Sequence, residues 1–553
     1  MLFVLLAHIT FIQAFASKGR SADPRNERTL IARFDQPRGA IVTFDGTTVA
    51  ASRETGGGPY RYRRFYPHGE MYAPITGYVA PRRTTGIERA EEIVLSGRDP
   101  KVKVRSLVRD GTSQAADVRL TISERAQRAA YQGLKSARVP GAAVAINPAT
   151  GAILALATWP SYDPNAYTTF DRAERARTDQ RLRRDPAGPL LNRALDRTYP
   201  AGSASKLVMA AAALASGEYA PTTVLPAPPR LHLPPAHRDQ AIPDAPAGGR
   251  EHGGPDAHRG PADRPAAVRQ DPAGGLRPDA SGGAARVRPD LAGRAGGDRM
   301  GPGGSDEVRP DLGGRPCGNS GLTLAQAFQA SCDAAFAGIG LRLGQDTLRD
   351  QAEAFGFNRD DLAIPLPAAA STFPASLDRS GAALSAVGGP GIRVTPLMVA
   401  MLSAAVANGG TLMHPYLVEE VRLPGGLAIN RAGPSPYRTA LSPALAEQLT
   451  SMMTTGPRPG GRGTAAARQG ALRSAAAVPD KAPAAWGASA MRTSAKGMFA
   501  MGMPVRGRPV TPTPAIFTAF APARAPEVAV GVVLERPGPV AAIARAILQA
   551  ALA

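Results

Sequence analysis

Two side chains in the segment YPAGSASKLVMAAAALASG could form a nucleophile and its base. Ser203 and Lys206 stand where a helix is predicted to begin, and a spacing of three residues places both side chains on one face. A serine in the first turn has its hydroxyl near unpaired backbone N–H groups, and a lysine one turn on can accept its proton if burial lowers the lysine pKa. The pair therefore predicts an acylatable serine; the alternative is a serine N-cap beside a solvated lysine.

Lysine usage favours the catalytic interpretation. The chain contains 65 lysines and arginines together, yet lysine stands only at positions 18, 101, 103, 135, 206, 481 and 496. Arginine cannot lose its proton to act as a base. In a chain that rarely uses lysine for surface charge, a lysine beside a candidate nucleophile is favoured for its chemistry.

The composition limits the classes of function. With 553 residues the chain has room for about two to four domains. The formal charge of +20 comes with abundant Arg, Ala, Gly and Pro and sparse Lys, Ile, Asn and aromatic residues, which is typical of a GC-rich genome. No zinc-finger spacing is present, so we expect no nucleic-acid partner. The positive charge favours approach to anionic membrane or wall polymers.

The first 16 residues, MLFVLLAHITFIQAFA, form one apolar run followed by basic residues. The run is slightly shorter than the roughly 20 residues of a spanning helix, and it has neither a basic flank before it nor a convincing cleavage site. We interpret it as an uncleaved N-terminal membrane anchor shortened by a late start; the alternative is a buried amphipathic helix. The anchor predicts a cell-membrane protein with everything after it outside the cytoplasm.

The first third of the chain predicts an α+β fold. Residues 37–52 alternate around an Asp-Gly turn as in a hairpin, and 84–97 have the pattern of a short helix. Residues 117–134 pass from a strand into a helix capped by Ser123, and 141–164 contain two strands around a Pro-Ala-Thr-Gly turn.

Later segments predict buried helices and a final hairpin. The helix after Ser203 is apolar nearly all round and ends near Gly217, so it should be central. Thr323 and Gln326 form a capping box for a helix over 322–344. Two further helices, a strand pair and a terminal helix are predicted at 394–410, 442–456, 515–535 and the C-terminus.

Two segments and two cysteines leave alternatives open. Residues 232–314 and 457–511 lose all periodicity; the first is a disordered insertion or a translated frame error, and no function is assigned to it. Cys317 and Cys332 would be expected to form a disulfide outside the cytoplasm. Two free buried thiols are the alternative.

Several motifs in order resemble class B penicillin-binding proteins, in particular those of actinobacteria. They are GAILALATWPSYDPN, NRALDRTYPAGSASK, TLAQAFQASCDAAFA and GGPGIRVTPLMVAMLSAAVANGG, and TTGIERAEEIVLSG is similar to the family's membrane-proximal N-terminal domain. The resemblance implies a penicillin-binding transpeptidase fold over 116–553, with an antiparallel sheet flanked by helices and an all-helical subdomain. It also implies a smaller mixed non-catalytic domain over 17–115.

The resemblance further implies a serine-type D-Ala-D-Ala transpeptidase that cross-links peptidoglycan stem peptides. Ser203 would be the nucleophile and Lys206 the proton acceptor, with the Ser203 backbone N–H as one oxyanion donor. β-Lactams would trap the same serine, and neither a metal nor an organic cofactor is required. Implied partners are stem peptides, the cell membrane, and a glycan polymerase or cell-division proteins.

The family's second motif, Ser-x-Asn, falls on Ser331-Cys332-Asp333. Ser331 fits a proton relay towards the leaving group. Asp333 departs from the motif, because an ionised carboxylate only accepts hydrogen bonds. It should raise the pKa of Lys206 and weaken it as a base, which predicts slower acylation. The alternative is that Asp333 only caps a helix.

The third motif, Lys-Thr-Gly, is missing. Lys481 in VPDKAP is the favoured substitute for the lysine that binds the substrate carboxylate, although Pro483 removes a strand donor. Lys496 in TSAKGM is the second candidate, and both could be loop lysines. The sequence thus leaves two functions: an active transpeptidase, or a catalytically impaired protein of the same fold that acts as a wall-synthesis scaffold or is a damaged gene product.

Overall fold

The structure is a computed structural model that describes residues 27–102, 104, 115–228, 230–234, 311–313, 321–389, 391–423, 426–454, 484–485 and 514–553. The predicted anchor (1–16), Cys317, Lys481 and Lys496 lie outside these ranges. All the residues described belong to one compact unit. Within them, no helix combines the length and the apolar character needed to cross a bilayer.

An antiparallel five-stranded sheet forms the centre, in the order β21-β22-β23-β7-β8. The two predicted hairpins supply four of its strands, and the β22–β23 pairing runs from Ala515 opposite Leu534 to Ala521 opposite Val528. Every residue of β22 and β23 is buried, which explains their continuous apolar sequences. The strands are β7 (Gly141–Ile146), β8 (Ile153–Trp159), β21 (Ala484–Ala485), β22 (Ala515–Ala521) and β23 (Val528–Leu534).

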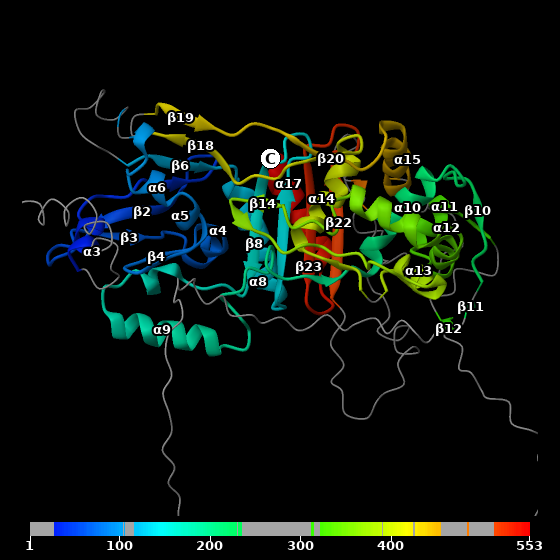
Figure 1. The fold of residues 1–553 in the computed structure, drawn as a ribbon, viewed down its shortest axis with the longest axis horizontal. Coiled ribbons are helices and arrows are strands. Elements are labelled where there is room, and N and C mark those ends of the chain that lie inside the picture. Colours follow the sequence, from blue (N-terminus) through cyan, green and yellow to red (C-terminus); the bar gives the residue numbers. More distant parts are fainter. Residues whose placement is uncertain are drawn as a thin grey trace, which may run out of the picture. The chain divides into compact units, whose positions relative to one another are not determined.

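Helices cover both faces of this sheet (Figure 1). On one face α8 (Glu124–Ala137) and α17 (Val540–Leu552) bury Leu134 and Ile547. On the other face lies α14 (Pro396–Ala407), as predicted for 394–410. At Gly531 in β23 an added Cβ would meet the Ala400 backbone N at 2.5 Å, so this close contact requires glycine.

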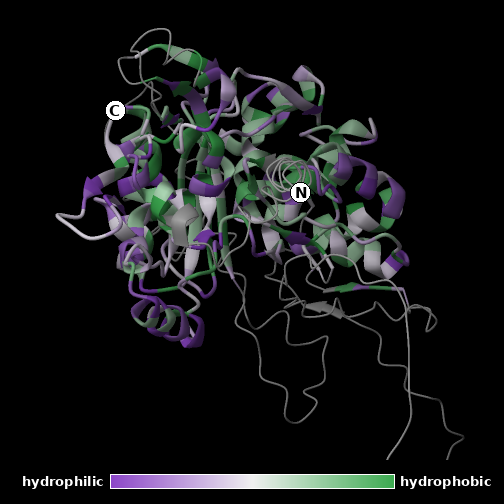
Figure 2. Ribbon diagram, turned by 60° about the vertical axis from the view of Figure 1, so that its left-hand side comes forward, coloured by the Kyte–Doolittle hydropathy of each residue, from purple (hydrophilic) through white to green (hydrophobic). Residues whose placement is uncertain are grey.

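A group of helices lies beside the sheet (Figure 1). Its centre is α10, whose residues from Ser205 to Leu214 are all buried, as the all-round apolar sequence predicts. Hydrophobic residues fill the interior elements and hydrophilic ones line the outer elements (Figure 2). The group consists of α10 (Ser205–Ala215), α11 (Leu324–Ala330), α12 (Asp333–Ala354), α13 (Arg379–Ser385) and α15 (Pro443–Thr454).

The N-terminal region contains a six-stranded sheet in the order β19-β18-β6-β1-β2-β3. The predicted hairpin over 37–52 supplies β1 and β2, and β18 and β19 return from residues 418–431 to complete the sheet. The strands are β1 (Ile41–Val42), β2 (Thr48–Glu54), β3 (Tyr62–Phe65), β6 (Asp117–Leu120), β18 (Val418–Arg422) and β19 (Ala428–Arg431).

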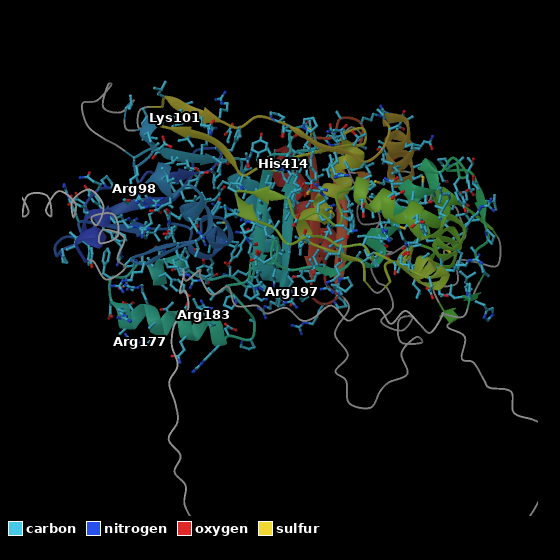
Figure 3. The ribbon with its side chains drawn as sticks, viewed as in Figure 1. Arg98, Lys101, Arg177, Arg183, Arg197 and His414 are labelled. Atoms are coloured by element: carbon cyan, nitrogen blue, oxygen red, sulfur yellow. The ribbon has the colours of Figure 1, made fainter. Side chains whose placement is uncertain are left out.

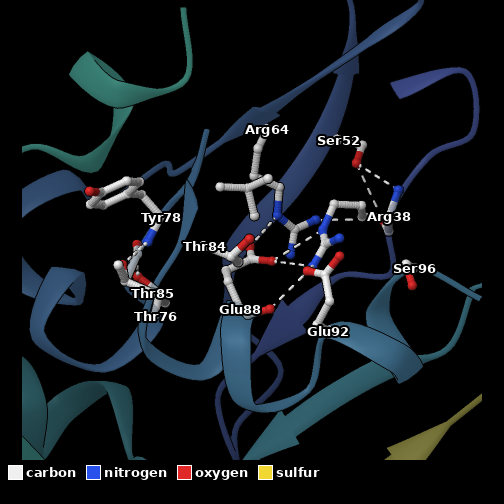
Figure 4. A network of polar contacts seen from close by, with 12 residues as sticks. Arg38, Ser52, Arg64, Thr76, Tyr78, Thr84, Thr85, Glu88, Glu92 and Ser96 are labelled. Atoms are coloured by element: carbon white, nitrogen blue, oxygen red, sulfur yellow. Dashed lines mark hydrogen bonds and ion pairs between the residues drawn. The ribbon is translucent and has the colours of Figure 1, made fainter. Parts of the chain in front are cut away.

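A buried ion cluster holds this region together (Figure 4). Glu88 is fully buried and accepts from Arg64 and Arg38, with 3.0 Å between Arg38 Nη2 and Glu88 Oε2. Burial raises the pKa of Glu88, but the two guanidinium groups outweigh it and hold the pKa below its usual value. Arg38 also contacts Glu92 at 2.9 Å.

Three predicted elements differ in detail. Residues 84–97 form two helices, α5 (Gly86–Ala90) and α6 (Glu92–Leu95), because the chain leaves the helical conformation at Glu91. Ser123 stands at the N-cap of α8, but its side chain makes no cap bond, and Asp45 accepts instead from the Glu124 backbone N–H. The helix predicted over 322–344 is broken at Ser331.

The remaining elements connect these layers. Helix α9 follows an N-cap at Asp171, whose carboxylate accepts from the Ala173 and Glu174 backbone N–H groups. The other bounds are α3 (Glu27–Phe34), η2 (Gly69–Met71), α4 (Ala73–Thr76), β4 (Val79–Ala80), β5 (Arg83–Thr84), η3 (Pro164–Tyr167), α9 (Arg172–Arg184), β9 (Tyr199–Pro200), η4 (Gly202–Ala204), β10 (Val224–Leu225), β11 (Arg230–His232), β12 (Asp311–Gly313), β13 (Leu322–Thr323), β14 (Ala363–Ile364), β15 (Leu366–Pro367), β16 (Arg393–Val394), β17 (Thr411–Met413) and β20 (Pro436–Thr439).

Candidate active site

Ser203 occupies the short turn η4, which runs directly into α10. The residue is 6% exposed. The segment before it is fixed to the body of the protein, because β9 pairs with β16 and the Ala201 N–H donates to Ile392 O at 3.0 Å. A rigid approach of this kind keeps a nucleophile in one position.

A pair of glycines sets that position. Gly202 has φ +50° and Gly388 has φ +82°. A Cβ added to Gly388 would lie 2.0 Å from the Gly202 carbonyl oxygen. Only glycine permits this approach, so the loop at Gly388 supports the turn that carries Ser203. Residue types and spacing did not predict this role; the Gly388-Gly389-Pro390-Gly391 run is the signal that could have revealed it.

Ser331 stands at the break between α11 and α12. It adopts the left-handed conformation, with φ 52° and ψ 48°. The Cys332 N–H donates to Ala327 O at 2.9 Å and closes the end of α11 as in a helix C-cap. The prediction of one continuous helix was wrong because no glycine or proline marks this position. The capping box of Thr323 and Gln326 that begins α11 is confirmed.

The fully buried ammonium group of Lys206 joins the candidate residues. Its Nζ donates to Ser331 Oγ at 2.7 Å and to Ser331 O at 2.9 Å, and it also contacts Asp333 Oδ1. Ser203 Oγ lies 3.3 Å from Ser331 Oγ. The structure therefore brings Ser203, Lys206, Ser331 and Asp333 into one connected group.

Burial and charge act in opposite directions on Lys206. Burial lowers its pKa and is the larger effect, whereas Asp333 raises it. The resulting pKa lies below the usual lysine value. The expected effect of Asp333 is present but does not prevail, and a lysine of this kind can exist as a free amine at lower pH than one in water.

Asp333 is the first residue of α12, where a carboxylate is favourable near the positive end of the helix. Its side chain is 29% exposed and reaches Lys206 from there. The capping alternative was wrong, because Cys332 rather than Asp333 holds the N-cap position of α12. Phe336, one turn further on, lies with its ring centre 6.0 Å from Lys206 Nζ and adds to the burial of the amine.

The edge strand β21 lies, in sequence, between the two lysines that could replace the lysine of the missing Lys-Thr-Gly motif. Ala484 pairs with Phe520 and Ala485 with Ala519, so β21 extends the central sheet. Lys481 precedes this strand by three residues and Lys496 follows it by eleven, and both lie outside the described residues.

Cys332 is buried and disulfide-bonded. Cys317 lies outside the described ranges, so its pairing stays a prediction. In the described part of the chain, no three His, Cys, Asp or Glu side chains are placed to hold a metal ion. A surface hollow lined by Asp350 and Tyr437 shares no residue with the Ser203 group.

Comparison with known proteins defines the class. Residues 141–251 and 310–552 match the penicillin binding protein transpeptidase domain, and residues 38–118 match the penicillin binding protein A dimerisation domain. The chain belongs to the penicillin-binding protein transpeptidase family. The match omits 252–309, inside the segment without periodicity.

The similarity extends over almost the whole chain. Peptidoglycan D,D-transpeptidase PbpA of Mycolicibacterium smegmatis is 33% identical over 97% of this chain and 92% of its own length. The Mycobacterium tuberculosis protein of the same name is 32% identical over 100% and 96%. Penicillin-binding protein A from M. tuberculosis, solved as an imipenem acyl-enzyme complex, has a TM-score of 0.70 at 30% identity, covering 94% of this chain and 100% of that one.

Proposed function

We propose that the chain is a peptidoglycan D,D-transpeptidase whose nucleophile is Ser203. The observation that carries this proposal is the buried contact of Lys206 Nζ with Ser331 Oγ, which in turn lies 3.3 Å from Ser203 Oγ. The relatives named peptidoglycan D,D-transpeptidase PbpA and the β-lactam acyl-enzyme complex of a similar structure support the same chemistry.

The first half-reaction forms an ester. Ser203 Oγ attacks the carbonyl carbon of the penultimate D-Ala and passes its proton to neutral Lys206, directly or through Ser331. The carbonyl oxygen takes the negative charge, and the Ser203 backbone N–H donates to it. The C–N bond then breaks, and Ser331 relays the proton from Lys206 to the departing D-Ala amine.

The second half-reaction forms the cross-link. An amine of a second stem peptide attacks the ester carbon and loses a proton to the same base. The ester C–O bond breaks, and Ser203 recovers its proton as the new amide forms. No electron transfer occurs, and each proton taken by Lys206 is returned within the cycle.

Lys481 is the proposed ligand of the substrate carboxylate. Its position three residues before β21 supports this assignment over Lys496, because β21 is the edge strand next to β22. We expect Lys481→Ala to lower the rate of acylation by a charged β-lactam by at least tenfold. Lys496→Ala is the matched control and should leave the rate within twofold; the reverse ranking would transfer the role to Lys496.

The protein is proposed to act at the cell membrane, held by residues 1–16, with its catalytic domain outside the cytoplasm. The apolar run and the disulfide-bonded Cys332 support this location. Deleting residues 2–16 should move the protein from the membrane fraction to the soluble fraction. Continued membrane association of the shortened chain would contradict the anchor.

Release of D-Ala from a stem pentapeptide tests the reaction itself. The wild type should release D-Ala and join an added amine acceptor, and Ser203→Ala should do neither. A non-catalytic scaffold is the second candidate, favoured by Asp333 in place of asparagine and by the missing Lys-Thr-Gly. A wild type that folds but releases no D-Ala would favour that scaffold.

A further inference from the structure

Helix α9 carries an unusual density of positive charge. Six of its 13 residues are arginine, whereas lysine and arginine together account for 65 of the 553 residues of the chain. Arg177 and Arg183 mark the helix in Figure 3. The high arginine content of the whole chain does not by itself explain why six arginines occur in one short helix.

Three of these arginines form a stripe. Arg177, Arg181 and Arg184 are exposed and follow the i, i+4, i+7 spacing of one helix face, about 10 Å from end to end. Among the described residues none of the three makes an ion pair. Their neighbour Arg183, in contrast, pairs with Asp179 at 2.6 Å. Arg181 and Arg184 stand in the last turn, where positive charge is favourable, but Arg177 and Arg181 at i, i+4 repel each other.

Other arginines near α9 extend the positive charge beyond this stripe. Arg83 pairs only loosely with Asp179, at 3.9 Å. Burial is the largest cause that lowers the pKa of Arg175, and the nearby cations Arg82 and Arg172 lower it further. The cationic surface therefore continues from α9 onto the N-terminal region.

The chemistry of the surface indicates the kind of partner. Guanidinium groups bind phosphate oxygens in pairs and are less strongly hydrated than ammonium groups. The apolar side of α9 faces the protein, where Thr178 is buried and Leu182 is half-buried. Since the only exposed apolar residues of α9 are the small Ala173 and Ala176, α9 is suited to lie on charged headgroups rather than among acyl chains.

The position of α9 favours a membrane over a distant polymer. Phe170, two residues before α9, stacks on Tyr60 with 4.1 Å between ring centres and meets Phe34 of α3 at 5.1 Å. Only the ten residues 17–26 separate α3 from the apolar run 1–16. Ten residues span at most about 36 Å and the eight residues of α3 about 12 Å more, so the proposed anchor would hold the start of α9 within about 50 Å of the bilayer.

We propose that Arg177, Arg181 and Arg184 of α9 bind anionic phospholipid headgroups of the membrane in which the chain is anchored. This inference rests on the proposed anchor. The contact would hold the N-terminal region against the bilayer and limit the directions in which the catalytic domain can turn.

The test uses the full chain in vesicles. Gln180→Cys, on the exposed side of α9, is labelled with a fluorophore under non-reducing conditions, and the unsubstituted chain labelled in the same way is the blank. Quenching by nitroxide-headgroup lipid is compared between vesicles of phosphatidylcholine alone and vesicles containing 30% phosphatidylglycerol. Flotation of the neutral vesicles reports on the anchor independently.

We expect at least twofold more quenching in the anionic vesicles. It should fall to the neutral level in 1 M salt, where the screening length is about 3 Å, and in Arg177→Gln/Arg181→Gln/Arg184→Gln. The control Arg125→Gln/Arg524→Gln/Arg536→Gln removes the same charge from exposed positions elsewhere and should retain the quenching.

Three results would overturn the inference: equal quenching in both kinds of vesicle, equal loss in the two triple variants, or a response to soluble anionic wall polymer but not to anionic vesicles. Flotation with neutral vesicles without α9 quenching would leave the anchor intact and reject only the α9 contact. Flotation and quenching confined to anionic vesicles would support the α9 contact and reject the anchor.

Discussion

At the scale of single residues, the site depends on the pKa of Lys206, which burial and the charge of Asp333 shift in opposite directions. Burial favours the free amine, and Asp333 favours the ammonium form. The sequence predicted this opposition, because the resemblance to the family's second motif implied that Asp333 lies beside Lys206. The balance between the two effects could not be predicted, because it depends on complete burial of Nζ and on the Phe336 ring, which are properties of the folded helices.

Asp333→Asn should make the protein acylate faster at neutral pH. Removing the carboxylate removes the effect that raises the Lys206 pKa, so the rise of rate with pH should shift to lower pH. We expect the acylation rate at pH 7 to increase roughly tenfold, the scale of one charge-assisted hydrogen bond. Stopped-flow measurement of acylation by a chromogenic cephalosporin from pH 6 to 10 tests this. An unchanged profile would show that Asp333 does not control the base.

At the scale of elements, the proposed catalytic residues meet because the chain departs from regular helix and loop geometry at Ser331 and Gly388. The Ser203 helix, the sheet hairpins and the Thr323 capping box were predictable from periodicity and end signals. The break at Ser331 was not, since a left-handed serine has no local signature. The close approach of Gly388 to Gly202 joins segments far apart in sequence, which a linear pattern cannot reveal.

Gly388→Ala should impair acylation more than its backbone strain alone explains. The new Cβ would collide with Gly202 O and displace the turn that carries Ser203. We expect a 10- to 100-fold lower acylation rate, since misplacement of a nucleophile by about 1 Å has effects of this size. Gly46→Ala is the control, because Gly46 has a similar φ of +86° but no atom near its added Cβ. Equal acylation rates in both variants would refute the positioning role.

At the scale of the whole molecule, the fold continues on both sides of the segment 232–314 that lacks periodicity. The N-terminal region is stabilised separately, by its buried ion cluster. Strands β11 and β12 pair at the two ends of the segment without periodicity, so the chain departs and returns at adjacent points. The sequence located that segment by its composition. It gave no sign that Glu88, Arg64 and Arg38 would meet, because their ion cluster joins a helix to two other segments.

Glu88→Gln should lower the free energy of unfolding by about 3–5 kcal/mol, because it leaves buried Arg64 without its counter-ion. The contribution of Glu88 should be complete above the carboxyl pKa of the unfolded chain and disappear as pH falls through the lower pKa of the folded state. Urea denaturation at pH 7 and in acid measures both effects. Glu54→Gln, at an exposed pair, should cost less than about 1 kcal/mol, and an equal cost would contradict the account.

The most direct test of the central claim is peptide-mapping mass spectrometry after incubation with penicillin. The proposed mechanism predicts one covalent adduct per chain, located on the peptide that contains Ser203 and absent from Ser203→Ala. An adduct on another residue, or no adduct on a folded wild-type chain, would contradict the claim that Ser203 and Lys206 form a working acylation site.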